Sequence, residues 1–325
     1  MKIKEYSDSH QNDVCDLFEH VYGKKVIPEF FTWRYYNFGK PLRYVMINED
    51  DNSVIGHYVI HPIPFKILNN EEEIQFSMTV MTHPKFRNNG VFTKLANFIY
   101  ENALNHDQKF AMGFPNSSSS EIHFKKLNWM NFGYPIEYTK KIVNVDFKLD
   151  LDYNIIEIED FGNEIDFIWE KHKHEYDLLI PRTQKFLNWR YTQQPIPKFS
   201  NYPSEKYFFF IMFNENTPIM YFILKQFGND KMHILDYFGE LTNLTIKNML
   251  IFTENFCQKL NLSNLSLWVS LDIDSNNLKN FFKNSGFISK NADSYFGIRY
   301  FDEKYKKIVN DDKKWFITMS DCDIF

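Results

Sequence analysis

The chain has 325 residues, of which 44% are hydrophobic and 24% are charged, and its net charge at pH 7 is −5. Its length predicts two domains, and its composition is that of a globular protein rather than a disordered one. The mild negative charge gives no broad positive field for a phosphate backbone, so we expect no nucleic acid partner.

The sequence shows no sign of export. Its first residues, MKIKEYSD, do not resemble a signal peptide, and no apolar run approaches the roughly 18 residues of a membrane helix. Cys15, Cys257 and Cys322 are odd in number and far apart, which favours reduced thiols, and no zinc spacing is present. We therefore expect a cytoplasmic protein that holds no metal and does not insert into a membrane.

An internal repeat is visible in the chain. Residues 31–35, FTWRY, recur as LNWRY at 187–191, and each copy is followed by a proline. A strand, a polar turn and a second strand follow each copy, with strands expected at 44–47, 54–60, 207–213 and 218–227. A match of this length also arises by chance, but the matching order of elements favours duplication.

Strands and helices then alternate in the first half. The strand before His83-Pro84 ends there because proline cannot donate to a β-ladder, and apolar residues at helical spacing follow from Val91. The elements expected are strands at 74–82 and 109–114, helices at 91–105 and 117–127, and strands at 129–132 and 138–145.

The second half repeats this order. An acidic stretch at 149–160 without a clear period is the expected linker, which divides the chain into domains at 1–148 and 149–325. The elements expected after it are helices at 162–176, 245–260 and 275–285 and strands at 232–238 and 265–270.

The loop between the strand at 74–82 and the helix at 91–105 has the features of an anion site. Gly90 allows the chain to turn sharply and to approach a ligand closely, and unpaired amides at a helix N-terminus attract anions. Arg87 adds a fork of donors that suits phosphate oxygens. The alternative is an ordinary turn with a surface arginine. The residues expected to form this diphosphate cradle are Arg87, Asn88, Asn89, Gly90, Val91 and Phe92.

The segment 81–95, MTHPKFRNNGVFTKL, resembles the signature of GNAT acetyltransferases, in which a strand leads through an Arg/Gln-x-x-Gly-x-Gly/Ala loop into a helix. Phe92 stands where the last small residue is usual. The resemblance covers residues 30–145 well and the remainder by order of elements only. It implies an α/β (α+β) protein of two tandem GNAT-like domains, each with a mixed, largely antiparallel twisted sheet flanked by helices.

The resemblance also implies a cosubstrate, acetyl-CoA or another acyl-CoA, with no metal. In that fold the pantetheine arm pairs with a strand edge, here the backbone of Val80, Met81 and Thr82. Asn116 and Ser118 follow the next strand, where the family places polar contacts to the cofactor; the alternative is that Asn116 and Ser117 only form the turn and cap. Between residues 239 and 243 the second half has no arginine and a glutamate, so we expect it to bind no coenzyme A.

Catalysis in this family needs little covalent help, since alignment of amine and thioester supplies most of the acceleration. Phe124 stands where the family often has a tyrosine that protonates the leaving thiolate. His123 is the expected substitute, and His57, on a strand expected to line the acceptor cleft, is the first candidate base; a structural role is the alternative for both. Trp33, Arg34 and Tyr35 are expected to bind substrate or line the junction between the domains, with aromatic packing as the alternative for the two rings.

The function expected from the resemblance is transfer of an acyl group to a primary amine of a small molecule, with an amino sugar nucleotide as the leading candidate. Aminoglycosides, polyamines and peptides are other acceptors that the sequence leaves open. A protein that binds acyl-CoA without turnover, as a sensor or scaffold, is the rival from another class. The sequence does not predict the oligomeric state.

Overall fold

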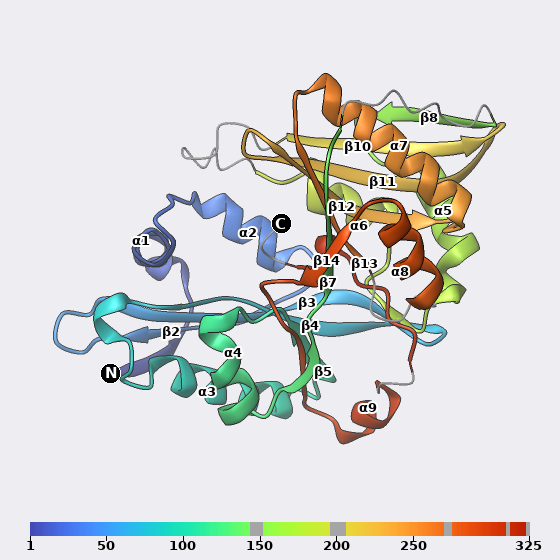
Figure 1. Ribbon diagram of the computed structural model, residues 1–325. Coiled ribbons are helices and arrows are strands. Elements are labelled where there is room, and N and C mark those ends of the chain that lie inside the picture. The colour runs from blue at the N-terminus through green and yellow to red at the C-terminus, as the bar shows by residue number, and fades with distance from the viewer. Residues whose placement is uncertain (144–151, 196–205, 270–274, 310–312, 323–325) are drawn as a thin grey trace.

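In the computed structural model, the described residues, 1–143, 152–195, 206–269, 275–309 and 313–322, form two mixed sheets flanked by helices (Figure 1). The strand order of the first sheet is β1 (Lys2–Glu5), β2 (Leu42–Ile47), β3 (Val54–Ile67), β4 (Asn70–Thr82), β5 (Phe110–Gly113), β15 (Phe296–Tyr300), β6 (Met130–Gly133). The short strand β9 (Leu178–Leu179) also pairs with β3. The path of the second sheet is β14 (Ile288–Asn291), β7 (Ile136–Lys141), β13 (Asn264–Val269), β12 (Lys231–Gly239), β11 (Thr217–Phe227), β10 (Lys206–Asn214), β8 (Tyr153–Ile158). Among these strands only the pairs β4–β5 and β12–β13 are parallel, so the expected largely antiparallel, tandem fold is confirmed.

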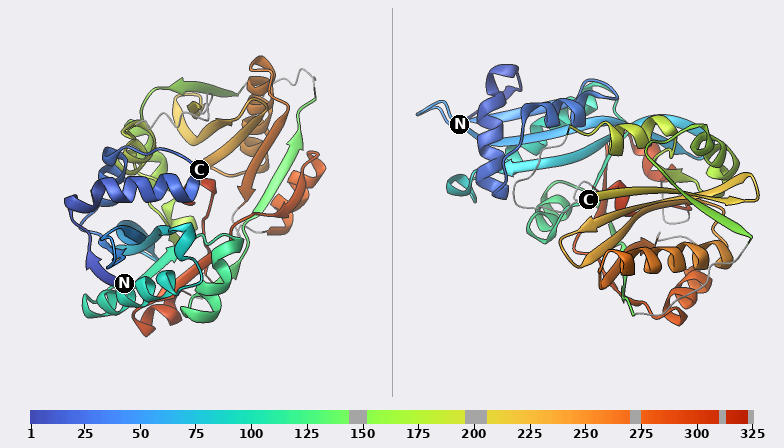
Figure 2. Two further views of the ribbon diagram at one scale, coloured as in Figure 1. Left: turned by 90° about the vertical axis from the view of Figure 1, so that its left-hand side faces the viewer. Right: turned by 90° about the horizontal axis from the view of Figure 1, so that it is seen from above.

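Helices cover both faces of each sheet. In the first half α1 (Gln11–Tyr22) and α2 (Pro28–Tyr36) lie on one face, and α3 (Val91–Asn105) and α4 (Ser117–Lys126) lie on the other (Figure 1). The helices of the second half are α5 (Asn163–His172), α6 (Gln184–Leu187), α7 (Asn243–Lys259), α8 (Ser275–Asn284) and α9 (Glu303–Ile308). On the second sheet, α7 and α8 lie on the face opposite to α5 (Figure 2, right).

Strand β3 continues to Ile67, beyond the end at residue 60 that the sequence predicted. The prediction ended there because Pro62 and Pro64 argue against a strand. Strand β2 pairs with β3 only as far as Ile60, and β9 joins β3 only at residues 66–67. Between these points one side of β3 is an open edge. Two prolines two residues apart face the same side, so their missing amides cost the ladder with β4 nothing.

The sequence of strand β10 is a continuous apolar run because both faces of the strand are covered. Phe209 and Ile211 belong to one buried cluster, together with Ile165 of α5, whereas Phe210 and Met212 belong to another. Alternate residues of a strand point to opposite faces, so a strand covered on both faces is apolar throughout. The first of these clusters also contains Val59 and Met78 of the first sheet, so the two halves share a core.

Each sheet takes a strand from the other half of the chain. Strand β7 pairs with β13 and β14 of the second sheet, and β15 is inserted between β5 and β6 of the first. The expected domain boundary at residues 148–149 lies outside the described residues, but the division into sheets does not follow it. The expected assignment of cofactor binding to 1–148 alone stays a prediction.

The expected linker at 149–160 is wrong over its second part, because residues 153–158 form β8. This strand pairs antiparallel with β10 at the end of the second sheet (Figure 1). Among the described strands only β10 pairs with it, and none of its residues is fully buried, which is typical of an edge strand rather than of a central one.

The two copies of the repeat meet at the junction between the halves. Trp33 Nε1 donates to the carbonyl oxygen of Trp189 at 2.7 Å, and Trp189 Nε1 donates to that of Trp33 at 3.0 Å. Their ring centroids are 5.4 Å apart. A reciprocal pair of this kind is what an approximate two-fold axis between duplicated units produces, and it supports the predicted duplication.

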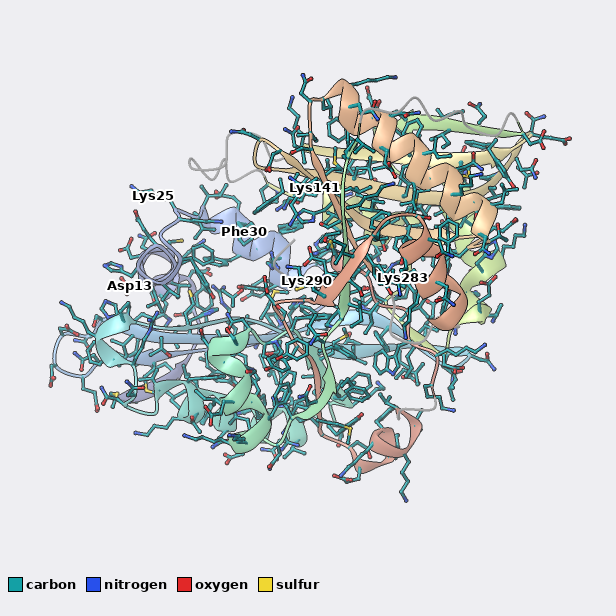
Figure 3. All side chains as sticks on the ribbon, in the orientation of Figure 1. Asp13, Lys25, Phe30, Lys141, Lys283 and Lys290 are labelled. Carbon is teal, nitrogen blue, oxygen red and sulfur yellow. The ribbon has the colours of Figure 1, made fainter. Side chains whose placement is uncertain are left out.

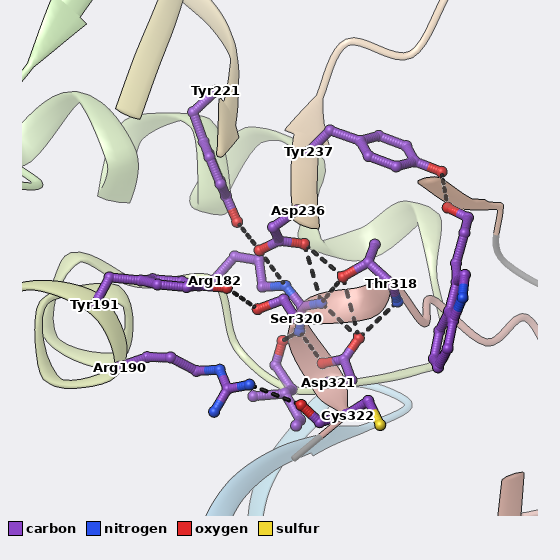
Figure 4. A network of polar contacts seen from close by, with 12 residues as sticks. Arg182, Arg190, Tyr191, Tyr221, Asp236, Tyr237, Thr318, Ser320, Asp321 and Cys322 are labelled. Carbon is purple, nitrogen blue, oxygen red and sulfur yellow. Dashed lines mark hydrogen bonds and ion pairs between the residues drawn. The ribbon is translucent and has the colours of Figure 1, made fainter. Parts of the chain in front are cut away.

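A buried ionic network ties the last described residues to the second sheet (Figure 4). Arg182 donates two hydrogen bonds of 2.7 Å to Asp321 and a third of 3.3 Å to Asp236 on β12. Thr318 and Tyr221 also donate to Asp236, at 2.7 and 2.8 Å. Removal of one partner from such a buried ion pair costs about 3–5 kcal/mol, so the network fixes residues 318–321 on β12.

Candidate active site

A cleft of about 1060 Å³ opens beside the loop that the sequence singled out. Its walls come from α1, α2, β4, α3, β5 and α4 of the first half and from β10 and β11 of the second. Phe30 of α2, on the same side of the first sheet as α1, is one of its apolar lining residues (Figure 3). The site is therefore shared by both halves of the chain.

The cleft passes the point where two parallel strands separate. The ladder between β4 and β5 consists of Gln75–Ala111 and Phe76–Met112, although β4 continues for six residues beyond it. The space between them is lined by residues 77–80 and 82 of β4, by Gly113 at the end of β5 and by residues 114–116 after it. The expected splay is present, and it leaves an edge of β4 on which an extended ligand can pair.

A β-bulge in β4 changes the direction of its side chains at this point. His57 pairs with Met81 and Val59 pairs with Met78, so two residues of β4 oppose one of β3, and Thr79 has a positive φ of 50°. The bulge leaves Val80 and Thr82 on the cleft side, whereas the side chain of Met81 is buried in the core. Of the three expected contacts, Val80 and Thr82 therefore line the cleft and Met81 does not.

His57 does not line the cleft. Its side chain is 0% exposed; Nδ1 donates to the carbonyl oxygen of Thr79 at 3.0 Å, and Nε2 accepts from Arg43 Nε at 2.9 Å. Burial, and next the Arg43 guanidinium, holds the pKa of His57 well below its ordinary value. Expected as a base, His57 instead fixes the bulge, because both ring nitrogens are already engaged.

The start of α3 has the geometry of an anion site. Gly90, the N-cap, has φ 74°, and Asn88 has φ 66°. The first bond of the helix runs from the Lys94 amide to the Gly90 carbonyl at 2.9 Å, so the amides of residues 91–93 precede it and have no helical acceptor. Arg87, Asn88, Gly90, Val91 and Phe92 line the cleft, whereas Asn89 is exposed outside it.

Asn116 and Ser118 face the cleft from the start of α4. Asn116 Oδ1 caps the helix, since it accepts from the amides of Ser118 and Ser119 at 3.1 and 3.2 Å. The capping role considered for Asn116 is therefore present, and it is compatible with a contact from the remaining amide nitrogen.

His123 also lines the cleft, between the rings of Phe92 and Trp129. Its Nδ1 lies 2.9 Å from the Ser119 carbonyl oxygen and must carry the proton, because a carbonyl only accepts. Burial lowers the pKa of His123 to about 4. At neutral pH its Nε2 is therefore an acceptor without a proton, so the expected role of protonating a thiolate does not fit.

The three residues of the first repeat separate in space. Arg34 lines the cleft, where Nε donates to the Met78 sulfur at 2.9 Å and the guanidinium lies 5.4 Å from the centre of the Phe30 ring. Trp33 is engaged with Trp189, and Tyr35 is 0% exposed and packs on Phe31. For both rings the alternative of packing is the one that the structure supports.

Comparison with known families agrees with this geometry. Residues 2–130 match the family model of the acetyltransferase (GNAT) domain. The first part of this chain is thus similar in sequence to a GNAT domain. This match covers less than half of the chain, and together with the cleft it supports a GNAT-type N-acyltransferase, a class that uses an acyl-CoA and an amine acceptor. No curated protein matches the chain in sequence.

Solved structures extend the likeness to the whole GNAT tandem. A GCN5-related N-acetyltransferase from Anabaena variabilis is similar with a TM-score of 0.71 and 12% identity, covering 93% of this chain and 73% of that one. A tandem GNAT protein from the clavulanic acid biosynthesis pathway has a TM-score of 0.60 and 9% identity, covering 93% and 98%. Saccharomyces cerevisiae N-myristoyltransferase with myristoyl-CoA has a TM-score of 0.60 and 8% identity, covering 92% and 78%. At these identities the likeness is one of fold.

The second GNAT-like unit lacks the open helix start of the first. Thr242 caps α7 by accepting from the Thr245 amide at 3.2 Å, and the Thr245 hydroxyl accepts from the Thr242 amide at 3.0 Å. A Cβ at Gly239 would lie 2.3 Å from the Ile219 carbonyl oxygen, so this glycine is required for close packing on β11. This capped, closely packed turn supports the expectation that the second half binds no coenzyme A.

Several residues of the cleft were missed from the sequence. They are Tyr22 and Lys24 near the end of α1 and Gln194, Tyr207 and Lys225 of the second half. Tyr22 donates to the Val80 carbonyl oxygen at 3.4 Å. No local pattern marks these residues, because only tertiary packing, within the first half for Tyr22 and Lys24 and between the halves for the others, brings them to the cleft.

Within the part of the chain that the structure describes, no cluster of three or more His, Cys, Asp and Glu residues is placed to hold a metal ion. Likewise, none of the helices in the described segments is both long and apolar enough to cross a bilayer.

Proposed function

We propose that the cleft binds acetyl-CoA and transfers its acetyl group to a primary amine of a small molecule. The diphosphate of the cofactor lies at the start of α3 beside Arg87, and the pantetheine arm follows the free edge of β4 past the bulge at Thr79. The amine enters from the side of α1, α2 and the second half. An amino sugar nucleotide is the proposed acceptor.

The observation that carries the proposal is one continuous cleft that joins unpaired amides at a helix start to a gap between parallel strands. The first feature suits a diphosphate, and the second suits an extended arm that hydrogen-bonds like a strand. A cofactor with both parts matches both features at once.

The proposed reaction is direct attack in a ternary complex. The amine nitrogen forms a bond to the thioester carbonyl carbon, the C–S bond breaks, and the thiolate of coenzyme A leaves while the nitrogen loses a proton. Alignment of two bound reactants accounts for most of the acceleration. His57 has no direct part in the reaction, and the neutral His123 contributes a hydrogen-bond acceptor rather than an acid.

A cytoplasmic location belongs to the same proposal. Acyl-CoA is a cosubstrate of the cytoplasm, and none of the three cysteines forms a disulfide.

The first test compares two charge removals on one loop. Arg87→Ala removes donors from the cleft, whereas Lys85→Ala removes an exposed charge two residues away that does not line it. A hydrogen bond to a charged group contributes about 1.5–3 kcal/mol, so Arg87→Ala should raise the dissociation constant of acetyl-CoA roughly 10- to 100-fold. Calorimetric titration measures both variants, and equal affinities would contradict the proposed cofactor site.

Thiol release from acetyl-CoA in the presence of primary amines tests turnover. The proposal requires release with at least one amine and a lower rate at limiting cofactor in Arg87→Ala. Tight binding of acetyl-CoA without thiol release for any amine would favour the sensor, which the absence of a tyrosine at Phe124 makes the second candidate.

A further inference from the structure

Around the cleft, the charged residues that the structure describes are all of one sign. Among the residues described at its walls, Lys24, Arg34, Arg87, Lys126 and Lys225 are basic, and none is Asp or Glu. The chain as a whole has 37 Lys and Arg and 42 Asp and Glu, so a random wall would carry acidic residues as often as basic ones. The positive wall is therefore a property of this site and not of the protein.

The cofactor explains only part of this charge. Arg87 lies on the loop before α3, and Lys126 ends α4, so both belong to the side of the first sheet on which these helices lie (Figure 1). On the other side of this sheet, Lys24 lies just before α2 and Arg34 lies on α2. Lys225 lies on β11 of the second half. Three basic residues thus line the part of the cleft through which the acceptor is proposed to enter.

Lys225 is the most constrained of the three. Its side chain lies on a central strand and is 4% exposed, directly opposite Tyr207 in the register of β10 and β11, with Nζ 5.3 Å from the centre of the Tyr207 ring. Arg34 approaches from the first half and is held by Met78, which immediately precedes the bulge. The two cations belong to different halves but to one cleft.

We infer that the acceptor amine carries an anionic group, a phosphate or a carboxylate, which Lys225 and Arg34 bind across the junction of the two halves. This inference rests on the proposed function and narrows it. Charges of one sign in a cleft with low-dielectric walls concentrate ligands of the opposite sign and repel those of the same sign. Polyamines and aminoglycosides are therefore excluded as acceptors, and the second half acts as the specificity element of the first.

The test uses acceptors that share an amine and differ in charge. Glucosamine, glucosamine 6-phosphate and UDP-glucosamine form one series, and ethanolamine and phosphoethanolamine form another. Glycine is an amine whose anionic group is a carboxylate instead of a phosphate, and spermidine and kanamycin represent polycations. We expect kcat/KM for the preferred phosphate- or carboxylate-bearing amine to exceed that of its neutral counterpart at least tenfold. Equal or higher values for neutral or cationic amines would overturn the inference while leaving the proposed function intact.

Variants then assign the effect to residues. Lys225→Met, and separately Arg34→Gln, should lower kcat/KM for the anionic acceptor at least tenfold, mainly through its KM, with the KM of acetyl-CoA unchanged. Lys225→Arg should keep the preference. Lys206→Met is the matched control, because Lys206 is an exposed lysine on β10 next to Tyr207 that does not line the cleft. A preference that survives in Lys225→Met and Arg34→Gln would overturn the assignment.

A binding measurement separates the two proposals if turnover is absent. Glucosamine 6-phosphate should raise the melting temperature of the native protein loaded with coenzyme A, glucosamine should not, and Lys225→Met should abolish the shift. A shift of this kind without thiol release would contradict the acyl transfer and support the anion site. No shift and no preference in turnover would contradict the anion site itself.

Discussion

Gly90 is the residue on which the proposed cofactor site depends most directly. Its φ of 74° is costly for a residue with a side chain, and a Cβ there would meet only Lys94 Cε, at 3.9 Å, so it would project into the open cleft. Gly90→Ala should lower the free energy of unfolding by about 1 kcal/mol through backbone strain. It should also weaken acetyl-CoA binding at least tenfold, as measured by calorimetric titration, because the methyl group occupies the space of the diphosphate.

Gly228→Ala is the control for this prediction at the residue scale. Gly228 has φ 65°, and a Cβ added there would meet nothing within 4 Å, so the substitution imposes the same strain at a residue that does not line the cleft. Urea unfolding should show similar losses in the two variants, and only Gly90→Ala should bind acetyl-CoA more weakly. If Gly90→Ala bound acetyl-CoA with native affinity, the proposed position of the diphosphate at the start of α3 would be wrong.

At the scale of elements, the reciprocal contact of Trp33 and Trp189 links α2 to the second copy of the repeat. Trp33→Phe and Trp189→Phe each remove one indole donor and leave a carbonyl unsatisfied, which lowers the free energy of unfolding by about 1 kcal/mol. Because the rings are in contact, we expect the losses in the double variant to be non-additive by at least about 0.5 kcal/mol. Urea unfolding of the two single variants and the double variant measures this coupling.

Trp169→Phe is a matched substitution, since the buried Nε1 of Trp169 has no hydrogen-bond partner. It loses no hydrogen bond and should be less destabilising than Trp33→Phe by about 1 kcal/mol. Strict additivity of the Trp33 and Trp189 variants would mean that the reciprocal pair does not act as one contact between the halves.

On the scale of the whole molecule, buried neutral histidines determine the response to acid. Burial lowers the pKa of His61 and of His233 to about 3 and that of His123 to about 4, and it holds that of His57 well below the ordinary value. These groups bind protons in the unfolded chain below about pH 6.5 but not in the folded one. Stability should therefore fall as the pH drops from about 6.5 towards 4, by up to about 1.4 kcal/mol per pH unit for each histidine.

His61→Gln tests this linkage. Between pH 6.5 and 4.5 its free energy of unfolding should depend on pH less steeply than that of the native protein, by about the contribution of one proton. His174→Gln, at an exposed histidine, should keep the native slope. The same slope in all three proteins, from urea unfolding at each pH, would show that His61 binds its proton equally in both states.

Sequence reasoning failed at His57 and at the expected linker for related reasons. Strand β3 is buried along almost its whole length, so no alternation of polar and apolar residues shows which face His57 occupies. Strand β8 is short and largely exposed because it lies at an edge, and it follows an acidic stretch, so its pattern is hard to distinguish from that of a loop. In both places the neighbouring strand decides, and it comes from a distant part of the chain.

The sequence by itself determined the loop that we propose for the cofactor, the helix behind it and the duplicated motif, because a positive φ at Gly90, the order of a strand and a helix, and a repeated run of residues are local properties. Only the tertiary structure decided that Lys225 and Tyr207 line the same cleft as Arg34, that His57 turns to the bulge, and that β7 and β15 exchange sheets. These features depend on contacts between residues more than 100 positions apart in sequence or on which face of a doubly covered strand a side chain takes, and neither leaves a periodic trace in the chain.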